Sequence, residues 1–265
     1  MKTRAMQAAI FVLLCVAMGG CDLARSYHGL GSENRVVDQS LAGRWYPVTD
    51  DEDRPYRVPA AVDVRVSGDG YDIWFTDDEY GAEPTRLRLH FVRSGEDTMF
   101  DLRRDLEDDG EMFAQLRLHH LGVAEWSEKT MVLGILLDAA PNEFATASGV
   151  EVIELNRNSS GKPPPFAGLV SDDEDKTDAA FDPLLQNGPH LLVGTSESLR
   201  AYLSLLKGKS EKAFIPLILT RHPNPLGGLT TDNERKALSA AGKYDPLLKR
   251  SMKHALEMGE AGDAP

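Results

Sequence analysis

Apolar and polar residues alternate with a period of two through most of residues 41–155. Successive side chains of a β-strand point to opposite faces, so this period indicates strands with one apolar face. Residues 62–66 and 71–75 both alternate in this way, and the turn sequence GDG separates them. They therefore predict a β-hairpin. The same alternation predicts further strands over residues 87–91 and 114–118.

Two later runs extend the predicted sheet. TMVLGILL (130–137) is apolar on both sides, which predicts a strand that other elements cover on both faces. GVEVIEL (149–155) predicts one more strand. The predicted strands follow one another with short turns and without a long repeat, so the sequence favours a mainly β domain, an antiparallel meander over residues 41–155. Because its apolar face must be buried, we expect the meander to close into a small barrel or a sandwich.

The rest of the chain is expected to complete this domain. Residues 156–188 are rich in Pro, Ser and Asp and predict a long polar loop. Residues 189–228 predict a strand, one C-terminal amphipathic helix and a second strand, with Thr195 as the N-cap of the helix. The apolar face of that helix consists of Leu199, Tyr202, Leu203 and Leu206. Residues 229–265 predict a polar tail that is partly helical or disordered.

The N-terminus has the pattern of a secretory signal peptide. Lys2 and Arg4 precede a short apolar run that ends in two glycines before Cys21, and residues 1–20 are the expected signal. The sequence Met-Gly-Gly-Cys at positions 18–21 resembles the lipobox of bacterial lipoproteins, with Met18 where leucine is usual. The resemblance implies that Cys21 carries diacylglycerol (the palmitate-type anchor of these proteins) and becomes the mature N-terminus. We expect residues 21–40, which are polar, to form a lipidated flexible tether.

This resemblance also implies a location in the cell. A lipoprotein of this kind is a membrane-anchored protein of the bacterial cell envelope, and it faces the periplasm. Asp22, directly after the cysteine, resembles the signal that keeps enteric lipoproteins in the inner membrane. The net charge of −13 disfavours nucleic acid as a partner, because binding to phosphates needs clustered Lys and Arg.

Gly43-Arg44-Trp45 resembles the G-x-W signature at the start of lipocalins. In that family the tryptophan closes one end of a β-barrel, and the cavity binds small apolar ligands. The resemblance therefore implies a lipocalin-like architecture for the meander. Trp45, Trp74 and Trp126 are the candidate residues for contact with a ligand or a partner, although core packing also explains them.

No catalytic, cofactor or metal site is expected from the motifs. His119 and His120 are adjacent in a predicted strand and point to opposite faces, so they cannot share one metal ion. We expect His90 and His119 to be solvated on the polar face of the sheet. The run from Asp105 to Gly110 resembles the first half of an EF-hand loop, but its twelfth position is Leu116, so a hairpin turn is the better interpretation.

Two functions therefore follow as expectations. The first is a non-enzymatic interaction module on a lipid anchor, and the alternative is a lipocalin-like carrier of a small apolar ligand. The interior of the domain distinguishes them, because a carrier needs an open apolar cavity, whereas an interaction module can have a filled core. A cluster of histidine and acidic side chains within about 4 Å of one another would instead indicate an enzyme.

Overall fold

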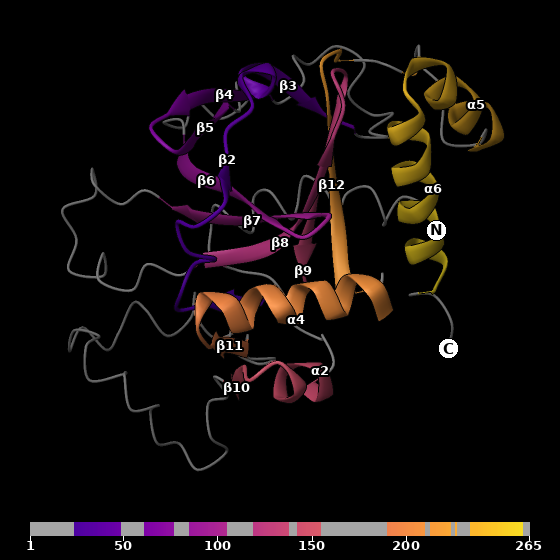
Figure 1. Cartoon of the computed structure of the whole chain (residues 1–265). Coiled ribbons are helices and arrows are strands. Elements are labelled where there is room, and N and C mark those ends of the chain that lie inside the picture. The colour runs from indigo at the N-terminus through magenta and orange to yellow at the C-terminus, as the bar shows by residue number, and fades with distance from the viewer. Residues whose placement is uncertain are drawn as a thin grey trace, which may run out of the picture.

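A computed structural model of the protein describes residues 24–48, 61–76, 85–104, 119–137, 142–154, 190–209, 213–223, 226 and 234–261. Eight antiparallel strands form a closed barrel (Figure 1). These strands are β3 (Gly43–Pro47), β4 (Ala61–Ser67), β5 (Gly70–Thr76), β6 (Thr85–Ser94), β7 (Asp97–Arg104), β8 (His119–Trp126), β9 (Thr130–Leu136) and β12 (Phe214–Thr220). Each pairs with the next along the chain, and β12 pairs with both β9 and β3. The predicted antiparallel meander is confirmed, and it closes as a barrel.

The predicted hairpin is β4 and β5, in which Val64 lies opposite Ile73 and Val66 opposite Tyr71. The predicted strand 87–91 is part of β6, and 130–137 corresponds to β9. The predicted strand 114–118 and the predicted loop 156–188 lie outside the described residues.

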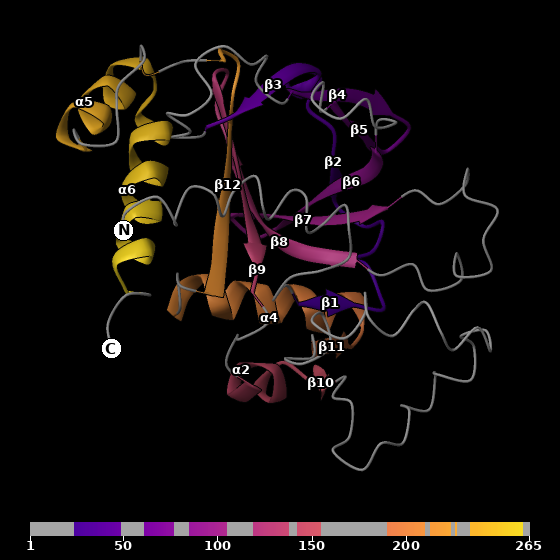
Figure 2. The ribbon, with the colours of Figure 1, turned by 180° about the vertical axis from the view of Figure 1, so that it is seen from behind.

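A short extension continues the sheet beyond the barrel wall. β1 (Arg25–Ser26) pairs with the first residues of β8, at the point where β8 is no longer paired with β9. β11 (His190–Val193) adds to β1, and β10 (Glu151–Glu154) adds to β11 (Figure 2). The predicted strand 149–155 therefore lies outside the barrel.

The interior of the barrel is a packed apolar core. Alternate residues of every barrel strand point inward and contact one another. The side chains of Trp45, Tyr71, Leu87, Phe91 and Phe100 have an exposed fraction of 0%. A side chain that borders a void large enough for water would have accessible surface there. These inward-facing residues therefore fill the space around them.

A second apolar layer lies outside the barrel, under α4 (Ser196–Lys209). As predicted, Thr195 caps this helix, because its Oγ1 accepts a hydrogen bond from the Ser198 amide at 3.1 Å. The four apolar residues predicted for one face, Leu199 to Leu206, are all buried. They pack on outward-facing residues of the barrel such as Met99 and Leu121, and the short helix α2 (Asn142–Ala147) lies beside α4.

The described part of the predicted C-terminal tail is helical, which is one of the two expected states, and it packs on the barrel. α6 (Pro246–Ala261) covers the outer face of β9 and β12, and α5 (Glu234–Tyr244) packs against α6 (Figure 1). Leu248 and Met252 pack against Ile218, while Val132 lies beside them. This contact explains why the run 130–137 is apolar on both sides. Among the described helices, none has the length and apolar character that crossing a bilayer requires.

The prediction of a flexible tether over 21–40 is wrong for the described part, residues 24–40. This segment contains β2 (Arg35–Val36), which pairs with β6, and the start of the 3₁₀ helix η1 (Gln39–Leu41). Ala24 is buried and Leu30 has no exposed surface. Polar composition predicted a solvated segment, but two apolar side chains and the hydrogen bonds described below attach it to the outside of the barrel.

Candidate functional site

One end of the barrel is closed around Trp45. Its indole Nε1 donates a hydrogen bond to the carbonyl of Leu41 in η1 at 2.8 Å. The guanidinium of Arg221, directly after β12, lies 3.8 Å from the centroid of the Trp45 ring. Arg221 also donates a hydrogen bond to the Ser40 carbonyl. A cation over an indole face is a favourable contact, so the first strand, the last strand and η1 are held together here.

Gly43 is needed for this closure. Its φ of +117° lies in a region that favours glycine, and a Cβ built on it would lie 2.9 Å from Arg221 Nη1. The Gly-x-Trp pattern therefore has a structural reason in this chain. Gly43 leaves room for the Arg221 side chain, and the Trp45 ring makes the cation–π contact with it.

The other two candidate tryptophans differ in their surroundings. Trp126 donates a hydrogen bond from Nε1 to Asp38 Oδ2 at 2.9 Å and contacts Phe91, so it belongs to the same closed end as Trp45. Trp74 is half-buried on the outer face of β5, between the guanidinium groups of Arg65 and Arg86. Of the three, Trp74 alone is on the outer face of the barrel wall.

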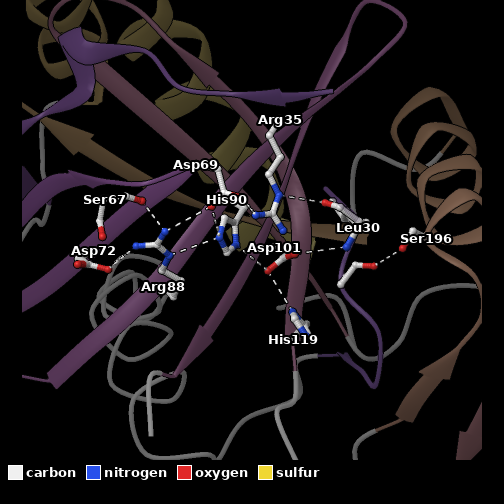
Figure 3. A network of polar contacts seen from close by, with 12 residues as sticks. Leu30, Arg35, Ser67, Asp69, Asp72, Arg88, His90, Asp101, His119 and Ser196 are labelled. Carbon is white, nitrogen blue, oxygen red and sulfur yellow. Dashed lines mark hydrogen bonds and ion pairs between the residues drawn. The ribbon is translucent and has the colours of Figure 1, made fainter. Parts of the chain in front are cut away.

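A polar pocket that no sequence motif predicted lies on the outside of the barrel, and we call it the outer-face pocket (Figure 3). Its volume is about 320 Å³. The barrel wall contributes His90, Asp101, Arg103 and His119 from β6, β7 and β8. The N-terminal segment contributes residues 28–32 and Arg35, and α4 contributes Ser196.

Asp101 is the centre of this pocket and is only 2% exposed. His119 Nδ1 lies 3.0 Å from Oδ1 of this carboxylate, and the amide of Leu30 donates to Oδ2 at 3.3 Å. Burial by itself would raise the pKa of Asp101, but the hydrogen bond from His119 and the proximity of His90 hold it below its usual range. Asp101 is therefore an ionised carboxylate, and His119 donates to it from Nδ1.

His90 lies on the other side of Asp101. Arg88 Nε donates to His90 Nε2 at 3.4 Å, so the neutral ring carries its proton on Nδ1. That Nδ1 is 3.7 Å from Asp101 Oδ1, which is longer than a hydrogen bond. It is buried and has no hydrogen-bond partner among the described residues.

The N-terminal segment forms one wall of the pocket because Gly29 fits closely over Asp101. A Cβ on Gly29 would lie 2.6 Å from Asp101 Oδ2. Ser196 Oγ donates to the Gly29 carbonyl at 2.9 Å, and Arg200 Nη1 donates to the Leu30 carbonyl at 2.6 Å. The pocket therefore exists only when this segment is docked between β7 and α4.

The expectation that His90 and His119 are solvated is wrong. Their alternation placed them correctly on the polar, outer face of the sheet, but His90 is buried and His119 is half-buried. The N-terminal segment covers this face, and the sequence gives no local signal for such a long-range contact. Asp101, a single acidic residue between Phe100 and Leu102, is the one position at which the sequence could have indicated a buried polar site.

Several predicted sites cannot be placed. Cys21, Asp22, the EF-hand-like run from Asp105 to Gly110 and Leu116 lie outside the described residues. Within the described part of the chain, no three His, Cys, Asp or Glu side chains are grouped as ligands for a metal ion.

Comparison of the chain with models of protein families, with curated proteins and with solved structures gave no match.

Proposed function

We propose that the protein is a lipid-anchored, non-enzymatic binding module of the bacterial cell envelope. Cys21 would carry the anchor, and the domain would face the periplasm, on the inner membrane if Asp22 is read as in enteric bacteria. The barrel would serve as a rigid scaffold that recognises its ligand or partner on the outside. The sequence around Cys21 supports the anchor, and the barrel itself supports the mode of recognition.

The observation that carries this proposal is the packed interior of the barrel. A carrier of an apolar molecule needs a preformed cavity of about 300–1,000 Å³ lined by apolar side chains. Large inward-facing residues, among them Leu87, Phe91 and Phe100, have no accessible surface instead. The pocket of about 320 Å³ lies on the outer face and has a polar lining.

A lipocalin-like carrier is the second candidate, and a specific observation favours it. The eight-strand meander, with Trp45 at its closed end, has the architecture that the Gly43-x-Trp45 resemblance implies. The filled interior weighs against this candidate, because apolar side chains of the protein occupy the space that a ligand would take.

An enzyme must also be considered, because a cluster of histidine and acidic side chains within about 4 Å of one another would indicate one, and such a cluster is present. His90 and His119 both lie within 4 Å of Asp101. A hydrolytic triad would also need a nucleophile hydrogen-bonded to the histidine. Two serines line the pocket. The Ser196 hydroxyl donates to the Gly29 carbonyl, and among the described contacts the Ser32 hydroxyl has no hydrogen bond to either histidine. We therefore assign the cluster to binding rather than to catalysis.

The proposal can be tested on the full chain purified from its native envelope in mild detergent. Mass spectrometry should find a mature N-terminus at Cys21 with fatty acyl chains. The Cys21→Ser variant, which cannot carry the anchor, should be absent from the membrane fraction after cell fractionation. A fluorescent fatty acid should not bind. An unprocessed N-terminus would refute the anchor. Saturable binding of the fatty acid, with a lipid that co-purifies, would favour the carrier instead.

A further inference from the structure

The ionised side chains that line the outer-face pocket are those of Arg35, Arg103 and Asp101, so the lining has an excess of positive charge. Arg35 forms an ion pair with Asp69. Asp72 forms ion pairs with two arginines. The distance from its carboxylate to Arg88 Nη1 is 2.8 Å and that to Arg86 Nη2 is 3.1 Å (Figure 3 shows Arg88). Both carboxylates are therefore already engaged by guanidinium groups next to the pocket.

Arg103 is the cation that lacks a carboxylate. It lines the pocket, and no described residue forms an ion pair or a hydrogen bond with it. In the register of β6 and β7 it lies directly opposite Arg88. Like charges directly opposite each other destabilise a sheet, and Asp72 compensates Arg88, so an anion beside Arg103 would reduce the remaining repulsion. Within the part of the chain that the structure describes, this guanidinium is unpaired, and an anion beside it would be stabilising.

His90 provides an independent sign that a ligand is missing. Its Nδ1 faces Asp101 Oδ1 at 3.7 Å, which is beyond hydrogen-bond distance, and no other described residue accepts a hydrogen bond from it, although its side chain is only 5% exposed. Buried donors in native proteins almost always have a partner, so an unpaired one needs an explanation. An oxygen atom of a bound molecule or of water in the pocket would satisfy it.

From these two observations we propose that the outer-face pocket binds a small molecule through a carboxylate or phosphate group, with Arg103 as its principal ionic contact. Arginine suits this role because its planar fork donates two parallel hydrogen bonds to an oxyanion. Asp101 fixes His119 and the N-terminal segment, and it does not contact the anion. This inference rests on the proposed function and names the ligand class of the binding module.

The volume of the pocket sets the size of the ligand. About 320 Å³ is at the lower end of the range for small-molecule sites, so the ligand is a small molecule or the anionic end of a larger one. The overall charge of the chain is −13, which repels anions from most of its surface. Binding to this pocket should therefore be specific to a local cation and not a general property of the protein.

Calorimetric titration of the full chain with sodium phosphate and with sodium succinate, each against sodium chloride at equal ionic strength, tests the inference. We expect one-to-one binding of at least one of the two anions. Binding of only one identifies the group as phosphate or carboxylate. Arg103→Gln should weaken binding by about tenfold or more, which corresponds to the loss of a charge-assisted hydrogen bond. Arg65→Gln, which changes an exposed arginine elsewhere on the outer face, should have no effect.

His90→Leu supplies a second readout that a merely structural role would not produce. Because His90 also accepts a hydrogen bond from Arg88 Nε, its removal should lower the free energy of unfolding. The readout specific to binding is the extra stabilisation of the fold by phosphate or succinate, which His90→Leu should reduce and Arg65→Gln should retain. The inference is overturned if neither anion binds, or if Arg65→Gln weakens binding as much as Arg103→Gln. If the fatty acid is still excluded and Cys21 is acylated in that case, the proposed function stands and the ligand class alone is wrong.

Discussion

Replacement of Phe91 by alanine tests whether the barrel interior is filled. Phe91 has no exposed surface, and its ring lies between Tyr71, with a centroid distance of 5.5 Å, and Trp126, at 4.9 Å. Truncation to alanine would remove the ring from the centre of this cluster. The strands on either side are paired, so they cannot close over the space.

We expect Phe91→Ala to lower the free energy of unfolding by about 4 kcal/mol, because buried Phe→Ala changes cost about 3–5 kcal/mol through lost transfer free energy and the remaining cavity. The measurement is urea denaturation followed by circular dichroism, with the m-value unchanged. Ile153→Ala is the matched control, because Ile153 is 38% exposed on β10 and its change should cost less than about 1 kcal/mol.

The same variant should gain a property that the natural protein lacks. A dry apolar cavity created in a packed core binds small apolar molecules such as benzene. Phe91→Ala should therefore be stabilised by benzene, while the natural chain should not respond. A loss of less than about 1 kcal/mol in Phe91→Ala, or an equal response of both proteins to benzene, would show that the interior is not packed as described. The preference for a binding module over a carrier would then lose its basis.

Three further predictions concern the ends and the outer face of the barrel. Burial, assisted by Arg25 and His119, lowers the pKa of His120 to about 4. The unfolded chain binds a proton below about pH 6.5 and the folded chain does not, so stability should fall by about 2 kcal/mol between pH 7 and pH 5, and His120→Gln should lose this dependence in denaturation curves. Arg221→Ala should cost about 1–2 kcal/mol and shift the fluorescence of Trp45, whereas unchanged values would contradict the closure described above. The lowered pKa of Asp101 stabilises the fold above about pH 4 and loses that effect as the pH falls further, so Asp101→Asn should flatten the acid limb of the stability curve.

Local elements and the faces that they bury could be predicted from the sequence. The alternation in residues 62–66 and 71–75 predicted a hairpin with the pairing that β4 and β5 adopt. The spacing of Leu199, Tyr202, Leu203 and Leu206 predicted the buried face of α4. These features depend on residues a few positions apart, so periodicity is sufficient to recognise them.

Closure of the barrel depends on contacts between residues that are far apart in the sequence. A sandwich and a barrel need the same alternation of apolar and polar residues, so the sequence left both open. The pairing of Pro47 with Leu219 joins the first and last strands across most of the chain. No local pattern can encode which distant edge a strand will find.

The outer-face pocket also depends on the tertiary structure. Docking of the N-terminal segment on Asp101 makes two expectations wrong, the flexible tether and the solvated histidines. Residues 24–40 are polar in composition, so they predict a tether, and His90 and His119 then lie on a bare polar face. Leu30 and the glycine at position 29 dock this segment on Asp101 instead. The sequence determined which side chains share the outer face. The docking of a distant segment decided that they are buried, because the cost of desolvating Asp101 is balanced by hydrogen bonds from residues far away in the chain.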